Sequence, residues 1–232
     1  MIVINPKNSR DFGIFTFFIT LLLAVVFIAS INTVVAAESS KANIDVKITE
    51  SMPFLDLNIN GKAIRIERIQ DQSYKITNSY AKTSRSCPPF CIRRIETDGV
   101  KTAGELELLD FLKDKVQHDK GLLIDARLKD WNVKGTIPGA INIPFTVFTG
   151  GLEDINTVNL LEILGVKEDE ANEKWLFDDA IDLMLFCNGP WCGQSQKAIK
   201  HLIKLGYPKD KIYWYRGGMQ AWQSFGLTIV KP

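Results

Sequence analysis

Between residues 103 and 225, short apolar runs alternate with segments in which apolar residues recur at helical spacing. The strand candidates are GLLIDA (121–126), AINIP (140–144), IDLMLFC (181–187) and IYWY (212–215). Helices are predicted over 103–119, 156–165, 195–205 and 219–225. Strands that alternate with helices form a parallel sheet covered on both faces. Residues 103–232 are therefore predicted to form an α/β domain, with a central parallel sheet flanked by helices.

The segment that precedes this domain, residues 38–102, has a different pattern. FLDLNI and AIRIERI alternate apolar and polar side chains with the period of a strand, and an Asn-Gly pair at 60–61 lies between them. Both residues of that pair tolerate the positive φ of a tight turn, so a small N-terminal β-hairpin is predicted. Residues 71–102 are polar and irregular, and the two prolines of SCPPFC (86–91) exclude a helix interior there.

The first residues of the chain resemble an export signal. Lys7 and Arg10 precede an apolar run at 12–30, and small residues at 35–37 would suit a signal peptidase, which predicts a signal peptide over 1–37. At about 1.5 Å rise per residue the apolar run could nearly span a bilayer, so attachment to the membrane through an uncleaved anchor is the alternative. Both interpretations place the rest of the chain in a periplasmic or other extracytoplasmic space.

Charge and cysteine content narrow the classes of partner. With 28 Lys and Arg against 27 Asp and Glu the net charge is +1, which gives no reason to expect a nucleic acid partner. The four cysteines are Cys87, Cys91, Cys187 and Cys192. An oxidising compartment permits two disulfides, and the three possible pairings stay open. No metal or cofactor is predicted, because these spacings differ from the two-residue spacing of a zinc knuckle.

The stretch LMLFCNGPWCGQS (183–195) carries the chemistry. An apolar strand candidate ends at Cys187, a loop with Gly189 and Gly193 follows, and a helical pattern then begins. Such a loop lies at the carboxyl edge of a parallel sheet, where folds of this class place their sites. Its amides and the positive end of the helix would favour a thiolate, and would equally hold a negatively charged persulfide.

Four separated stretches resemble, in order and spacing, a rhodanese-like domain that covers about residues 104–230. They are LLIDARL (122–128), GTIPGAINIP (135–144), FCNGPWCGQSQKAIKHLIKLGY (186–207) and YRGGMQAW (215–222). The resemblance implies an α/β fold and a sulfur-carrying cysteine, which by its place in the motif is Cys187. It also implies a substrate-binding loop, made of Asn188, Gly189, Pro190, Trp191, Cys192 and Gly193. By the same resemblance Asp125 and Arg127 support the site, and Gly217, Gly218 and Trp222 have a packing role.

Two positions depart from the family's pattern. Thr136 stands where many members have a histidine, and Cys192 stands where many have an arginine that helps to bind anionic donors such as thiosulfate. A thiol at position 192 suggests that it attacks a persulfide on Cys187, releases sulfide and leaves a disulfide, or that it resolves a mixed disulfide with a protein. A permanent structural disulfide is the simpler alternative. For Cys87 and Cys91 a local crosslink is favoured over a redox pair that exchanges with the loop.

The sequence therefore predicts an exported sulfurtransferase or persulfide carrier. Cys187 would take sulfane sulfur from a donor and pass it to a thiol acceptor, such as a protein thiol, or to another nucleophile. Two alternatives stay open: a periplasmic thiol–disulfide oxidoreductase that uses Cys187 and Cys192, and a non-catalytic binding module that kept the fold.

Overall fold

A computed structural model describes residues 44–95, 99–169, 171–172 and 174–232. The signal peptide or anchor predicted over 1–37 lies outside these residues. Within the described part of the chain, no helix is both long and apolar enough to cross a membrane. Residues 44–232 form one compact unit.

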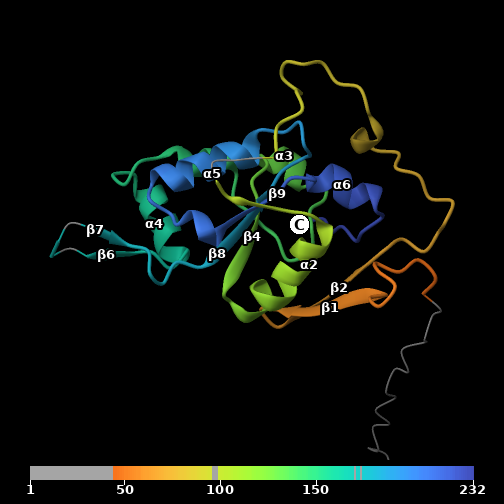
Figure 1. Ribbon diagram of the computed structural model, residues 1–232, viewed down its shortest axis with the longest axis horizontal. Coiled ribbons are helices and arrows are strands. Elements are labelled where there is room, and N and C mark those ends of the chain that lie inside the picture. The colour runs from red at the N-terminus through yellow and green to blue at the C-terminus, as the bar shows by residue number, and fades with distance from the viewer. Residues whose placement is uncertain (1–43, 96–98, 170, 173) are drawn as a thin grey trace, which may run out of the picture. The chain divides into compact units, whose positions relative to one another are not determined.

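A five-stranded parallel sheet forms the centre of this unit (Figure 1). In spatial order its strands are β3 (Lys101–Ala103), β9 (Ile212–Tyr215), β8 (Asp182–Phe186), β4 (Gly121–Asp125) and β5 (Ile141–Asn142). Every neighbouring pair is parallel, which confirms the predicted α/β architecture. Four of the strands lie within the predicted apolar runs. The edge strand β3 was not predicted, because three residues are too few for a period-two pattern to be recognised.

Five α-helices accompany the sheet in the described residues. They are α2 (Glu105–Asp114), α3 (Lys129–Asn132), α4 (Ile155–Ile163), α5 (Gln194–Lys204) and α6 (Gly218–Ser224). Short 3₁₀ turns are η1 (Ser79–Ala81), η2 (Val116–His118), η3 (Phe145–Thr149) and η4 (Lys209–Lys211). The helix predicted over 103–119 is shorter than expected, because α2 ends at Asp114 and the chain continues as η2.

The two faces of the sheet are buried by different elements. Successive side chains of a strand point to opposite faces, so Met184 and Phe186 of β8 pack with α2 and α6, whereas Leu183 and Leu185 pack with α4 and α5. All four side chains are at most 1% exposed. Burial on both faces explains why β8 is apolar along its length. It also holds the end of β8, and therefore Cys187 directly after it, in a defined position.

The predicted N-terminal hairpin is present. It consists of β1 (Phe54–Ile59) and β2 (Lys62–Glu67), joined at Asn60 and Gly61, whose φ angles are 51° and 76°. Its inner face packs on α2 through Leu57 and Ile66. The acidic segment at 167–174, which the sequence suggests is solvated surface, forms a second small hairpin of β6 (Lys167–Asp169) and β7 (Lys174–Leu176).

After β2 the chain does not return directly to the sheet. It passes α6, where Asn78 Nδ2 donates to Gln223 Oε1 at 2.6 Å, and then continues through the CPPFC segment to β3 (Figure 1). Tyr80, in η1, is 8% exposed and belongs to the same apolar core as α2 and α6. The irregular segment is therefore packed on the α/β core.

Candidate active site at the carboxyl edge of the sheet

Cys187 lies at the end of the central part of the sheet. It follows β8, which lies between β4 and β9, and Phe186 pairs in register with Asp125 on one side and Tyr215 on the other. Because the strands are parallel, the residues that follow all three strands meet at one edge. Cys187 is 2% exposed.

The sulfur atom of Cys187 is bonded to that of Cys192, and their Cα atoms are 6.3 Å apart. Cys87 and Cys91 form a second disulfide, with Cα atoms 4.6 Å apart. Of the three pairings left open by the sequence, the structure selects the one that joins near neighbours. In this state neither sulfur of the loop is a nucleophile, so any chemistry of the Cys187 thiolate requires that the bond first be reduced.

The loop between the two cysteines is held by main-chain hydrogen bonds to α6. Met219 N donates to Cys187 O at 3.0 Å, and Gln220 N donates to Asn188 O at 3.0 Å. Gly218 has a φ of 57°, and a Cβ at this position would overlap the carbonyl oxygen of Cys187. A glycine is therefore required at position 218, both because of the positive φ and because the backbone lies so close to the carbonyl oxygen of Cys187.

Asp125 and Arg127, predicted to support the site, form a buried ion pair next to the loop. Arg127 donates to the two carboxylate oxygens of Asp125 at 2.8 and 2.5 Å, and the two side chains are 1% and 0% exposed. Thr136 Oγ1 and Asn132 Nδ2 also donate to Asp125, at 2.8 and 3.1 Å. The threonine that departs from the family's pattern thus completes the set of donors around this carboxylate.

Tyr80, which no sequence pattern indicates, connects this ion pair to the cysteine loop. Its hydroxyl donates to Asn188 Oδ1 at 2.5 Å and accepts from Arg127 Nη1 at 3.0 Å. Burial raises the pKa of Tyr80, although Arg127 opposes the shift. Asn188, directly after Cys187, is therefore fixed by a residue of the N-terminal extension. The polar residues around Tyr80 have no periodicity that could have indicated its burial.

The CPPFC segment lies against the same loop. The Phe90 ring, between the first two cysteines, meets the Trp191 ring edge to face at 5.3 Å. The guanidinium of Arg85 lies 4.5 Å from the centre of the Trp191 ring, and Arg93 N donates to Pro190 O at 3.0 Å. The segment that carries the Cys87–Cys91 disulfide is therefore in contact with the loop that carries the Cys187–Cys192 disulfide.

The remaining predicted loop residues are also accounted for. Cys192 N donates to Gly189 O at 2.9 Å and closes the turn, and Trp191 Nε1 donates to Gln220 Oε1 at 2.6 Å. Gly193 is the N-cap of α5 and provides no side-chain acceptor. The first N–H groups of a helix have no hydrogen-bond acceptor within the helix. The N–H donors expected where the loop ends are therefore those of the first turn of α5.

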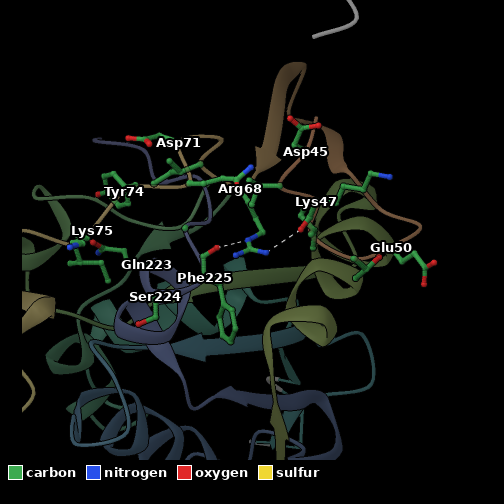
Figure 2. Close-up of a pocket in the computed structure, with 17 residues that line it drawn as sticks. Asp45, Lys47, Glu50, Arg68, Asp71, Tyr74, Lys75, Gln223, Ser224 and Phe225 are labelled. Carbon is green, nitrogen blue, oxygen red and sulfur yellow. Dashed lines mark hydrogen bonds between the residues drawn. The ribbon is translucent and has the colours of Figure 1, made fainter. Parts of the chain in front are cut away.

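A wide cavity of about 900 Å³ lies elsewhere, between residues 45–50, 68–76 and 223–226 (Figure 2). Arg68 crosses it and donates to Phe225 O at 2.7 Å and to Lys47 O at 3.3 Å. No cysteine lines this cavity. We therefore place the candidate active site at the buried cysteine loop, where the reactive groups are, and not in this cavity.

A family model described as the rhodanese-like domain matches residues 107–225, just over half of the 232 residues. No curated protein matches the chain.

Solved structures that are similar to the chain include two sulfurtransferases and a rhodanese-related protein. A human single-domain sulfurtransferase is 25% identical, with 54% of this chain and 97% of that chain covered and a TM-score of 0.38. A rhodanese-related protein from Thermoplasma volcanium is 20% identical, with 57% and 99% covered and a TM-score of 0.37. A thiosulfate sulfurtransferase from Pseudomonas aeruginosa is 17% identical, with 56% and 20% covered and a TM-score of 0.38.

Proposed function

Because the chain belongs to the family of rhodanese-like domain proteins, we propose that it is a sulfurtransferase or persulfide carrier that works through Cys187. The observation that carries this proposal is the place of Cys187 at the end of the central strand β8, in a loop that enters α5 and is held by α6. A thiolate at this position would be stabilised by the N-terminal dipole of α5.

The first half-reaction forms a persulfide. The reduced Cys187 thiolate attacks the outer sulfur of a sulfane-sulfur donor, the sulfur–sulfur bond of the donor breaks, and the rest of the donor leaves with the bonding electron pair. In the second half-reaction an acceptor thiolate attacks the outer sulfur of the persulfide and releases the Cys187 thiolate. Ping-pong kinetics are expected for such a cycle.

Cys192 offers a second outcome for the same intermediate. Its thiolate can attack the inner sulfur of the persulfide, so that a Cys187–Cys192 disulfide forms and hydrogen sulfide leaves after protonation. This step would produce the Cys187–Cys192 disulfide, the bond that the structure contains. A further turnover then requires two electrons from an external thiol reductant. We propose that this takes place outside the cytoplasm, as the N-terminal signal suggests.

The test uses three forms of the protein: wild type, Cys192→Ser and Cys187→Ser. Each is reduced, freed of reductant, treated with a sulfane-sulfur donor and analysed by intact and peptide mass spectrometry. The Cys192→Ser variant should hold a stable adduct of about 32 Da on Cys187, whereas wild type should release sulfide and recover its disulfide. Cys187→Ser should gain no adduct in the loop. Absence of an adduct on Cys187 in Cys192→Ser would refute the proposal.

The Cys187–Cys192 disulfide also favours a second candidate, a thiol–disulfide oxidoreductase. In that case the pair exchanges electrons with a protein dithiol and no sulfane sulfur is carried. The measurement is the reduction potential of each pair in a redox buffer. Values well below about −300 mV for both pairs would identify them as inert crosslinks and would exclude this function.

A further inference from the structure

Three arginines lie around the cysteine loop, and in the described part of the chain none of them forms an ion pair with an acidic side chain. Four ion pairs are formed among the described residues, and none includes Arg85, Arg93 or Arg216. Each of the three has a buried Nε atom for which no hydrogen-bond acceptor is present in the structure. Buried donors are normally satisfied, so a set of three at one place needs an explanation.

Arg93 lies directly on the loop. Its main-chain nitrogen bonds to Pro190, and its guanidinium covers Gly193, with Nη2 2.5 Å from the position that a Cβ of Gly193 would occupy. Gly193 is the N-cap of α5, a helix of 11 residues whose positive end faces the loop. A guanidinium and a helix N-terminus repel each other unless an anion lies between or beside them.

Arg216 reaches the same place from the sheet. It follows β9, and because Tyr215 pairs in register with Phe186, Arg216 is level with Cys187 at the carboxyl edge. Its Nη2 donates to Arg93 O at 2.9 Å, so the two arginines belong to one cluster.

Arg85 lies at the rim of this cluster, stacked on the Trp191 ring and donating to Ser79 O at 2.7 Å. Glu105, whose Oε1 lies close to Gly217, accepts a hydrogen bond from the Tyr215 hydroxyl at 2.9 Å. Among the described residues, no ion pair therefore balances the positive charge of these three arginines.

We propose that Arg93 and Arg216, with Arg85 at the rim, bind an oxyanionic group, a sulfonate or a carboxylate, carried by the compound that reacts at the cysteine loop. That this compound is a sulfur donor rests on the proposed function. The anion site itself does not, because it is made of guanidinium groups and requires no thiolate. Two of its three arginines come from the N-terminal extension, which thereby becomes part of the substrate site. Guanidinium groups suit this role because their planar N–H groups match the geometry of oxyanions.

The test measures binding with both disulfides intact, so that no sulfur can be transferred. The full chain is titrated at low ionic strength with two unreactive probes, methanesulfonate and S-methylglutathione, and the arginine Nε–Hε NMR signals are followed. At least one probe should shift the signals of Arg93 and Arg216. A shift with methanesulfonate identifies a sulfonate site, and a shift with S-methylglutathione alone identifies a carboxylate site. If neither probe binds, the proposal is wrong.

Variants separate a specific site from general attraction of anions. Arg93→Gln should weaken binding about tenfold or more, which corresponds to the loss of one charge-assisted hydrogen bond. Arg93→Lys should retain part of the affinity, and a native spectrum of this variant shows that the fold is kept. Arg94→Gln, a neighbouring exposed arginine, is the matched control and should change affinity less than about twofold. Equal losses in Arg93→Gln and Arg94→Gln would overturn the proposal.

The outcome is independent of the persulfide test. Anion binding without an adduct on Cys187 would leave the site in place and remove the sulfurtransferase function. An adduct on Cys187 without anion binding would support the sulfurtransferase function and refute the anion site.

Discussion

Replacing Tyr80 with phenylalanine removes a hydroxyl that links the N-terminal extension to the cysteine loop. The hydroxyl makes two buried hydrogen bonds, one to Asn188 and one from the charged guanidinium of Arg127. A neutral hydrogen bond contributes about 1 kcal/mol and one to a charged group about 1.5–3 kcal/mol, so the free energy of unfolding should fall by about 2.5–4 kcal/mol. The ring itself stays in place, because phenylalanine fills the same volume.

The assay is urea denaturation of the oxidised protein. With a dependence on urea of about 2 kcal/mol per M, the midpoint should move down by about 1.3–2 M. Tyr74→Phe is the matched control, because Tyr74 is 49% exposed, and it should change stability by less than about 0.5 kcal/mol.

A second readout separates a local effect on the site from general loss of stability. After reduction, alkylation of Cys187 should be faster in Tyr80→Phe than in Tyr74→Phe, because Asn188 is less firmly held. Peptide mapping assigns the modified cysteine. If Tyr80→Phe is as stable as Tyr74→Phe and its Cys187 reacts no faster, the Tyr80 hydroxyl does not position the loop and the reasoning is refuted.

Three further predictions concern other parts of the molecule. Asp125→Asn should lower the free energy of unfolding by about 3–5 kcal/mol, since it leaves the buried guanidinium of Arg127 without its counter-charge. Asp56→Asn, in the exposed ion pair that Asp56 forms with Arg65, should cost less than about 1 kcal/mol. Equal losses of stability in urea titrations would contradict this. Gly193→Ala should displace the Arg93 guanidinium, because three of its atoms lie 2.5–3.2 Å from the position of the added methyl group. Anion binding in the NMR titration should therefore weaken, although no charge is removed. An unchanged affinity for the anion would count against the assigned site. Burial raises the pKa of Tyr207 above its ordinary value of 10.0, so above about pH 10 the folded state keeps a proton that the unfolded state releases, and the free energy of unfolding should fall as the pH rises further. Tyr207→Phe should make this fall less steep in urea titrations between about pH 8 and 11. An unchanged dependence of stability on pH would show that this tyrosine is not responsible.

Most of the fold follows from local patterns in the sequence. The apolar run that becomes β8 is buried on both faces, and such a run can be recognised without knowledge of its neighbours. The Asn-Gly pair at 60–61 predicts the first hairpin for an equally local reason, since both residues adopt positive φ. The strand β3 and the hairpin at 167–176 were missed because their strands are three residues long and owe their pairing to partners elsewhere in the chain or to a polar surface segment.

The parallel α/β architecture and the place of Cys187 at the end of a buried strand can be predicted from the amino-acid sequence, because both depend on periodicity and on motifs that are continuous along the chain. The contact between the N-terminal extension and the cysteine loop becomes visible when the chain is folded. Tyr80 is 108 residues from Asn188, and Arg93 reaches Gly193 from an irregular polar segment. Contacts between residues so far apart depend on how the chain is packed, and packing leaves no period in the sequence of an irregular segment.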